Sequence, residues 1–365
     1  MRINLAAVGT GFLLLGQLST ASANDGKLYG IKSDGTREIF QIDVSGPDIA
    51  SGNIVQISSN AQGWVSNAAA RDPRDGRVFF TEALNNARVA VFDPSQSTLN
   101  GGTEDCVANP LNCQEEVPLG GTPAGNPQLA GRLGMRQSAT SPDPRLFGVA
   151  QNIAGRPIQV IDTNTGVSST YGVLTLGGSP LNTGAGGDQE FNPLDIMCPG
   201  PTADPADDFL IPAGSMFVIQ NVANPKVWVV PASEINTCDL TAECNLAVVE
   251  VTGAITAFGS RQPQGLGFDF NSDPAVNGGR PRAWTTWSPS GGDQGVIAAL
   301  DPCSGALVSS IIGTPKLISD LASVVTPGLT GFTGTGCRCV SPTSSSALAL
   351  LLAPALLFFR RRRSA

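Results

Sequence analysis

The chain has 365 residues, carries 22 basic against 30 acidic side chains for a formal net charge of −8, and contains no histidine. An acidic surface repels nucleic acid and anionic lipid, so we expect no nucleic-acid partner. The lack of histidine excludes Ser-His-Asp triads, Cys-His dyads and histidine-ligated metals, which leaves carboxylates, Lys, Tyr, Cys or oxygen-bound metals for any enzymatic chemistry.

The first 23 residues have the pattern of a signal peptide. A short basic start, Met1-Arg2, precedes an apolar stretch over residues 11–16, and Ala21-Ser22-Ala23 supplies the small residues that a signal peptidase requires. We therefore expect cleavage between Ala23 and Asn24, export of the protein, and a mature body over residues 24–336.

The body is rich in glycine and proline, with 43 and 27 residues, which favours many short strands joined by tight turns. One pattern recurs along it: a short apolar strand, a polar turn, a second β-rich strand, and then Asp or Pro with small turn residues. Alternating residues of each hairpin are expected to face in and out. Five copies are recognisable, at residues 28–46, 77–96, 145–166, 216–234 and 283–305.

A single hairpin cannot bury its apolar face, so the copies are expected to stack on one another. The sequence therefore predicts an all-β fold, a β-propeller of five to seven blades, in which residues 98–129 and 174–210 hide up to two more copies. A β-sandwich or an irregular solenoid is the alternative. The "DP" turns and the "VxVxD" strands resemble the NHL-type and YVTN-type propeller repeats, and that resemblance implies a propeller over residues 28–313.

A calcium loop is suggested by GFDFNSDPAVNGG, residues 267–279. Asp269, Asn271 and Asp273 stand at alternate positions, as the first oxygen ligands of a calcium loop do, but no glutamate follows as a closing ligand. Calcium is thus the one cofactor that the sequence suggests. The alternative interpretation is a hairpin turn closed by side-chain hydrogen bonds of the Asx type.

A second candidate site is an acidic insertion at residues 186–209, earlier in the chain. It carries six carboxylates, which predict either a solvated acidic loop or a metal, glycan or acid-pair site: Asp188, Glu190, Asp195, Asp204, Asp207 and Asp208. The tryptophans are candidates for a sugar-binding face, but core packing is favoured for Trp228 and Trp284, and Trp287 is the candidate for an exposed position. No convergent catalytic set is recognisable.

Cysteines of an exported protein are expected in disulfides. Cys106 with Cys113 and Cys238 with Cys244 are close enough in sequence for local bridges, and Cys198 and Cys303 are left to join distant segments. Spacing alone leaves the pairing open. A metal cluster is the less favoured use of these thiols, because no CxxC pair occurs.

The last segment, residues 337–365, contains Cys337 and Cys339, an apolar run over 347–359 and four arginines at 360–363. The apolar run is short for a helix that spans a bilayer, although a retained single-pass anchor is an alternative. The layout resembles the bacterial C-terminal sorting signals of the MYXO-CTERM type. This resemblance implies removal of the tail by a membrane protease, with Cys337 or Cys339 as the processing and anchoring point.

Together these features predict an exported protein of the cell envelope or outer surface with a binding or scaffolding role. The expected partners are the export machinery, the C-terminal processing protease and a glycan, protein or small anionic ligand. The alternative is a calcium-dependent hydrolase or lyase that uses carboxylates on a propeller scaffold.

Overall fold

The computed structural model describes residues 26–32, 38–59, 61–63, 66–72, 75–82, 88–117, 133–137, 144–149, 157–162, 168–181, 188–202, 204–238, 244–269, 277–292 and 294–323. The chain divides into two units, Met1–Thr330 and Gly331–Ala365, and every described residue belongs to the first. The predicted signal peptide and the predicted sorting tail, with Ala23, Asn24, Cys337 and Cys339, lie outside the described residues.

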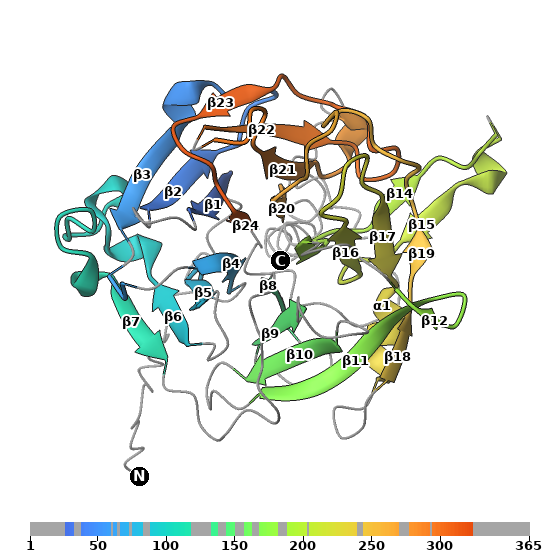
Figure 1. Ribbon diagram of the computed structural model, residues 1–365, viewed down its shortest axis with the longest axis horizontal. Helices are drawn as coiled ribbons and strands as arrows, with labels where there is room; N and C mark the ends of the chain where they lie inside the picture. The colour runs from blue at the N-terminus through green and yellow to red at the C-terminus, as the bar shows by residue number, and fades with distance from the viewer. Residues whose placement is uncertain are drawn as a thin grey trace, which may run out of the picture. The chain divides into compact units, whose positions relative to one another are not determined.

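The first unit is a five-bladed β-propeller, as the all-β prediction required (Figure 1). In order from the innermost strand outward, blade one consists of β24 (Asp320–Ala322), β1 (Lys27–Ile31), β2 (Glu38–Asp43) and β3 (Ile54–Ser59). Blade two consists of β4 (Ser66–Arg71), β5 (Val78–Glu82), β6 (Val89–Phe92) and β7 (Gln114–Val117).

Blades three to five follow the same plan. Blade three consists of β8 (Leu133–Gln137), β9 (Pro144–Val149), β10 (Pro157–Asp162) and β11 (Ser168–Leu176). Blade four consists of β13 (Asp188–Phe191), β16 (Met216–Ile219), β17 (Val227–Val230) and β19 (Val249–Glu250). Blade five consists of β20 (Gly265–Phe268), β21 (Ala283–Trp287), β22 (Gly295–Leu300) and β23 (Ile312–Thr314).

The ring closes through its innermost strands. β24 contacts β4, β4 contacts β8, β8 contacts β13, β13 contacts β20, and β20 contacts β24 again. Because β24 pairs with β1, blade one combines the end of the described chain with its beginning, as Figure 1 shows. The five predicted hairpin copies are the two central strands of the five blades, and the described residues of the two long insertions form no additional blade.

The insertions instead decorate the ring. β12 (Ser179–Pro180) extends blade three, and β18 (Cys244–Ala247), which follows α1 (Ala232–Thr237), pairs in parallel with β11 of blade three. β14 (Ile196–Cys198) and β15 (Phe209–Ile211) form a separate two-stranded hairpin. Short 3-10 turns complete the described elements: η1 (Ser51–Asn53), η2 (Pro94–Gln96), η3 (Thr98–Asn100), η4 (Pro110–Asn112), η5 (Pro205–Asp207) and η6 (Asn277–Gly279).

The core is divided among the blade interfaces. Five apolar clusters of buried residues each lie between two neighbouring blades. Successive residues of one strand enter opposite clusters, as Phe217 packs toward blade five and Val218 toward blade three. The expected alternation of buried and exposed residues is therefore wrong for strands such as β6, β16 and β17, which are buried on both faces because each sheet is covered on both sides.

Side-chain caps close the turns after the third strand of several blades. Asp43 Oδ1 accepts the N–H of Ser45 at 3.0 Å, and Asp93 Oδ1 accepts the N–H of Ser95 at 2.9 Å. The Asp at the end of the hairpins of blades one, two and five thus has a local structural role, since Asx turns hold the chain as it leaves the sheet.

Three disulfides join Cys106 to Cys113, Cys198 to Cys303, and Cys238 to Cys244. The expectation of disulfide bonds is confirmed, and two bridges are local while the third links segments 105 residues apart. Disulfides are typical of extracytoplasmic proteins. Within the described part of the chain, every helix is too short or too polar to serve as a transmembrane span.

Candidate functional site

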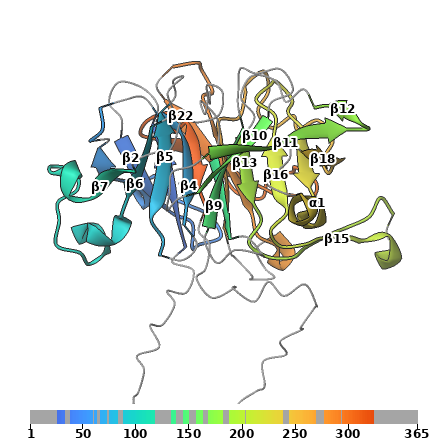
Figure 2. The ribbon, with the colours of Figure 1, turned by 90° about the horizontal axis from the view of Figure 1, so that it is seen from below.

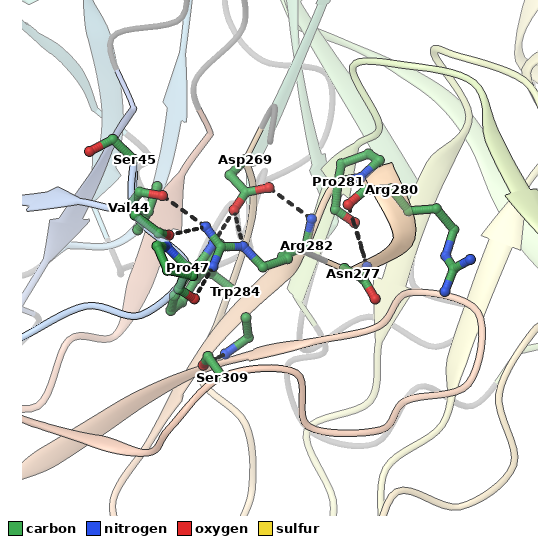
Figure 3. A network of polar contacts seen from close by, with 12 residues as sticks. Val44, Ser45, Pro47, Asp269, Asn277, Arg280, Pro281, Arg282, Trp284 and Ser309 are labelled. Atoms are coloured by element: carbon green, nitrogen blue, oxygen red, sulfur yellow. Dashed lines mark hydrogen bonds and ion pairs between the residues drawn. The ribbon is translucent and has the colours of Figure 1, made fainter. Parts of the chain in front are cut away.

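Asp269, the first predicted calcium ligand, lies directly after β20 and faces Arg282, directly before β21 (Figure 3). Asp269 Oδ2 accepts Arg282 Nε at 2.5 Å and Trp284 Nε1 at 2.9 Å, and its Oδ1 accepts the backbone N–H of Arg282 at 2.8 Å. Both members of the ion pair are almost completely buried. Both carboxylate oxygens therefore accept protein N–H groups.

Arg282 connects this carboxylate to blade one. Its guanidinium donates to the backbone carbonyls of Pro47, Val44 and Gly46 at 2.5–2.8 Å, and stacks over the Trp284 ring with 4.8 Å to the centroid. The planar fork of an arginine suits such multiple acceptors. The pair is thus a structural tie between blades five and one.

The other two predicted calcium ligands, Asn271 and Asp273, lie outside the described residues. Among the described residues, no group of three or more acidic, cysteine or histidine side chains is placed to hold a metal ion. The calcium site stays a prediction, and binding of calcium by Asp269 would require displacement of the arginine.

A second ion pair of blade five closes the turn after β22. Arg280 Nη2 lies 2.6 Å from Asp301 Oδ2, and Asp301 Oδ1 accepts the N–H groups of Cys303 and Ser304. Partial burial acts to raise the pKa of Asp301, but the hydrogen bond and charge of Arg280, together with these N–H groups, hold the pKa below its usual value. Asp301 is therefore ionised at neutral pH and serves the turn.

Sequence analysis named Asp188 and Glu190 but did not indicate their burial, and it missed Asp320; these carboxylates lie on the innermost strands. We call Asp188, Glu190, Asp320 and Ser323 the axial cluster. Asp188 and Glu190 belong to β13, Asp320 begins β24, Ser323 directly follows β24, and all four residues are at most 2% exposed. The prediction of a solvated acidic loop is wrong for Asp188 and Glu190, because the insertion begins as the innermost strand of blade four.

The axial cluster joins four blades through backbone N–H groups. Asp320 Oδ2 accepts the N–H of Ala69 on β4 at 2.7 Å. Ser323 Oγ accepts the N–H of Phe268 on β20 at 2.6 Å, and the N–H of Ser323 donates to Glu190 Oε2 at 3.3 Å. A buried N–H without an acceptor is costly, and an innermost strand has no further strand beside it to supply one.

Small residues allow the innermost strands of neighbouring blades to approach one another closely. A Cβ on Gly265 would lie 3.0 Å from the backbone nitrogen of Leu321, and one on Gly267 would lie 3.2 Å from Leu321 Cβ. Ala68, Ala69 and Ala70 play the same part on β4, where all three are buried. Five blades converge on the axis, so the inner positions leave room only for small side chains and for the carboxylates that bridge between strands.

Glu190 is the most perturbed acid of the axial cluster. Burial raises the pKa of Glu190 to about 8, and the negative charge of Asp188 adds to that rise, while hydrogen bonds from Phe191 and Ser323 act to lower it. Glu190 thus holds its proton at neutral pH.

Asp195, which accepts the N–H of Ala213, is exposed just before β14, and the other three acids of the insertion lie on a projecting hairpin. We call residues 196–211 the arm: β14, β15 and the loop between them, of which residue 203 is outside the described residues. Figure 2 shows β15 and its loop extending beyond the blades at the side of the ring. Asp204, Asp207 and Asp208 are exposed on its tip, as the solvated-loop interpretation predicted.

The tryptophans follow the prediction only in part. Trp284 and Trp228 are buried as expected. Trp287 was expected at the surface, but it is 4% exposed and packs edge-on against Phe258 with ring centroids 4.9 Å apart. No exposed tryptophan surface for sugar is formed by these three residues.

No protein-family model and no curated protein matches the chain. Solved structures resemble it weakly. A chain of the nidogen–laminin complex is 11% identical, with a TM-score of 0.40 over 81% of this chain and 97% of that one. TolB from Acinetobacter baumannii is 13% identical, with a TM-score of 0.34 over 80% of this chain and 55% of that one. A protein of unknown function from Bacteroides thetaiotaomicron is 12% identical, with a TM-score of 0.40 and coverage of 83% and 62%. The assignment as a propeller therefore depends on the strand pairing of this chain itself.

Proposed function

We propose that the protein is an exported β-propeller of the cell envelope that binds or scaffolds another macromolecule. The observation that carries this proposal is the distribution of its polar and apolar side chains. The axial carboxylates accept backbone N–H groups and hold the ring together, whereas exposed apolar side chains occur on the arm, where a partner has access to them.

Export is supported by the three disulfides, because such bonds form and persist outside the cytoplasm. The signal peptide over residues 1–23 and the sorting tail over residues 337–365 remain part of the proposal. In this scheme the export machinery and a processing protease act on the two ends, and the propeller is the part that meets a ligand.

The proposal is tested on the protein recovered from its native envelope fraction without reducing agent. We expect an intact mass that begins at Asn24, ends near Cys337 and includes three disulfides, and we expect cross-linking in intact cells to give a species larger than the monomer. A mass that includes Arg360–Arg363 would establish a retained anchor instead. A cross-linked sample that contains only monomer would contradict the scaffolding role.

A further inference from the structure

The two strands of the arm are held against the propeller, and the loop between them projects from it. Ile196 and Ile211 lie opposite each other in the hairpin and are buried in the cluster between blades four and five. The disulfide between Cys198 and Cys303 joins β14 to blade five. Because the base is held by both packing and a covalent bond, the arm is a preorganised projection.

On the face opposite to these buried residues, and at its outer end, the arm exposes large apolar side chains. Met197 and Leu210 are cross-strand partners and are each 50% exposed, and Phe209 is 41% exposed. Within the described residues, β14 and β15 pair only with each other, so each strand has an edge without a neighbouring strand. Such an edge accepts an added strand through its backbone groups.

The tip of the arm is acidic and internally ordered. Asp208 Oδ1 accepts the N–H of Gly200 at 3.1 Å, Asp204 Oδ1 accepts the N–H of Ala206 at 2.9 Å, and Thr202 Oγ1 donates to Asp207. These bonds keep the carboxylates in fixed positions. Asp208 immediately precedes Phe209, the first residue of β15, so negative charge adjoins the exposed apolar side chains of that strand.

The stretch of chain that carries the arm supplies no positive charge. The sequence contains neither lysine nor arginine between Arg156 and Lys226, a stretch that includes the whole arm and the innermost strand of blade four. A second copy of the protein would bring acidic tips together in a two-fold arrangement, because a two-fold interface pairs the same surface with itself. Charge therefore favours a partner of opposite sign over self-association.

We propose that the arm is a docking element for an extended, cationic and apolar segment of a partner protein. In this arrangement the segment lies along the hairpin, its apolar side chains contact Met197, Phe209 and Leu210, and its basic side chains approach Asp207 and Asp208. The inference rests on the proposed binding function and adds to it the place of binding and the chemistry of the partner.

The test uses the full-length protein and a fluorescein-labelled decapeptide of alternating lysine and valine, followed by fluorescence anisotropy. We expect binding in the micromolar range at low salt, weaker binding as salt rises, and no binding of the matching glutamate–valine peptide. A lysine–serine peptide of equal charge should bind at least about fivefold more weakly, since it lacks the apolar contacts.

Two pairs of variants locate the site. Met197→Ser with Leu210→Ser should weaken binding at least about tenfold, whereas Leu99→Ser with Leu111→Ser, which are at least as exposed and lie on blade two, should leave it within about twofold. Asp207→Asn with Asp208→Asn keeps the hydrogen-bond acceptors of the tip and should weaken binding about fivefold, against no change for Glu115→Gln with Glu116→Gln on β7.

Equal losses in the arm variants and their controls would overturn the proposal, because binding would then follow total charge alone. Absence of any binding to the wild-type protein would overturn it as well. So would light scattering that shows a dimer abolished by Met197→Ser with Leu210→Ser, because the occupant would be a second copy. None of these results bears on cross-linking in the native envelope, so failure of the docking proposal is distinguishable from failure of the proposed function.

Discussion

The two halves of the acidic insertion have opposite environments although they are neighbours in sequence. Asp188 and Glu190 lie on the innermost strand of blade four and are buried, whereas Asp204 and Asp207 lie on the exposed tip of the arm. In the first half the carboxyl groups face other strands, and Glu190 accepts a backbone N–H from the end of β24. In the second half they order a loop and give it negative charge.

This difference shows that the role of a carboxylate here depends on which strand of a blade carries it. An innermost strand lacks one neighbouring strand, so the backbone N–H groups on its open side need hydrogen-bond acceptors. Carboxyl groups of other innermost strands supply them and thereby connect the blades. On a projecting hairpin the same side chain remains hydrated and available to a partner. Variants that remove a charge in the buried and in the exposed environment test this comparison.

The largest effect is expected when a buried carboxylate loses its charged partner. Arg282→Met should lower the free energy of unfolding by about 4 kcal/mol, because Asp269 would stay buried without its ion pair. Arg77→Met is the matched control, since Arg77 pairs with Asp75 at the surface and its loss should cost below about 1 kcal/mol. Guanidinium unfolding under non-reducing conditions measures both, and similar losses would contradict the structural role of the buried pair.

A pH-dependent effect of similar size is expected at Glu190. Its pKa is about 8 in the folded protein against the usual 4.5, so its contribution to stability is fully present below pH 4.5 and is lost as pH rises through 8. Glu190→Gln keeps an uncharged side chain at every pH. The variant should lie close to the wild type near pH 5 and exceed its free energy of unfolding by about 4 kcal/mol at pH 9.

Urea unfolding from pH 5 to pH 9 measures this difference. Asp301 should show the opposite pH dependence. Because its pKa is lowered, its contribution to stability is present above the unfolded value of 3.8 and is lost as pH falls through the folded value. Parallel pH profiles of the wild type and Glu190→Gln would mean that Glu190 does not hold its proton in the folded protein.

The smallest effect is expected on the arm. Asp204→Asn should change the free energy of unfolding by less than about 0.5 kcal/mol at any pH between 5 and 9, since asparagine caps a helical turn as well as aspartate does. Differential scanning calorimetry beside Glu190→Gln makes the comparison direct. A pH-dependent change as large as that of Glu190→Gln would show that the tip is not the solvated region described above.

The central hairpins of the blades were predictable because both of their strands are runs of β-branched and aromatic residues followed by an Asp turn. The innermost strands were not. β4 is SNAAAR, β13 is DQEF and β20 is GLGF, and such short stretches of small or charged residues lack the apolar run that marks a buried strand. Their composition follows from the crowded axis, which is a property of the assembled ring and leaves no local pattern.

The candidate site was predictable to an even smaller degree. The spacing of Asp269, Asn271 and Asp273 suggests a calcium loop, yet the partner of Asp269 is Arg282, which the hairpin of β20 and β21 brings opposite it. A correct register for the β20–β21 hairpin would have predicted the pairing of Asp269 with Arg282. Glu190 and Ser323 are 133 residues apart and belong to blades that are not neighbours, so no sequence spacing indicates their hydrogen bond.

The closure of the ring by β24 has a consequence for the time course of folding. The bond between Ala69 and Asp320 joins residues 251 positions apart, and β1 has no partner on its inner side until β24 has been made. At about 5–20 residues per second, synthesis of the intervening chain takes on the order of 10–60 s. Blades two to five can form hairpins during this interval, but blade one remains incomplete and its apolar strands remain without cover. In the export proposed above, this delay keeps the native ring from closing until nearly all of the propeller has been made.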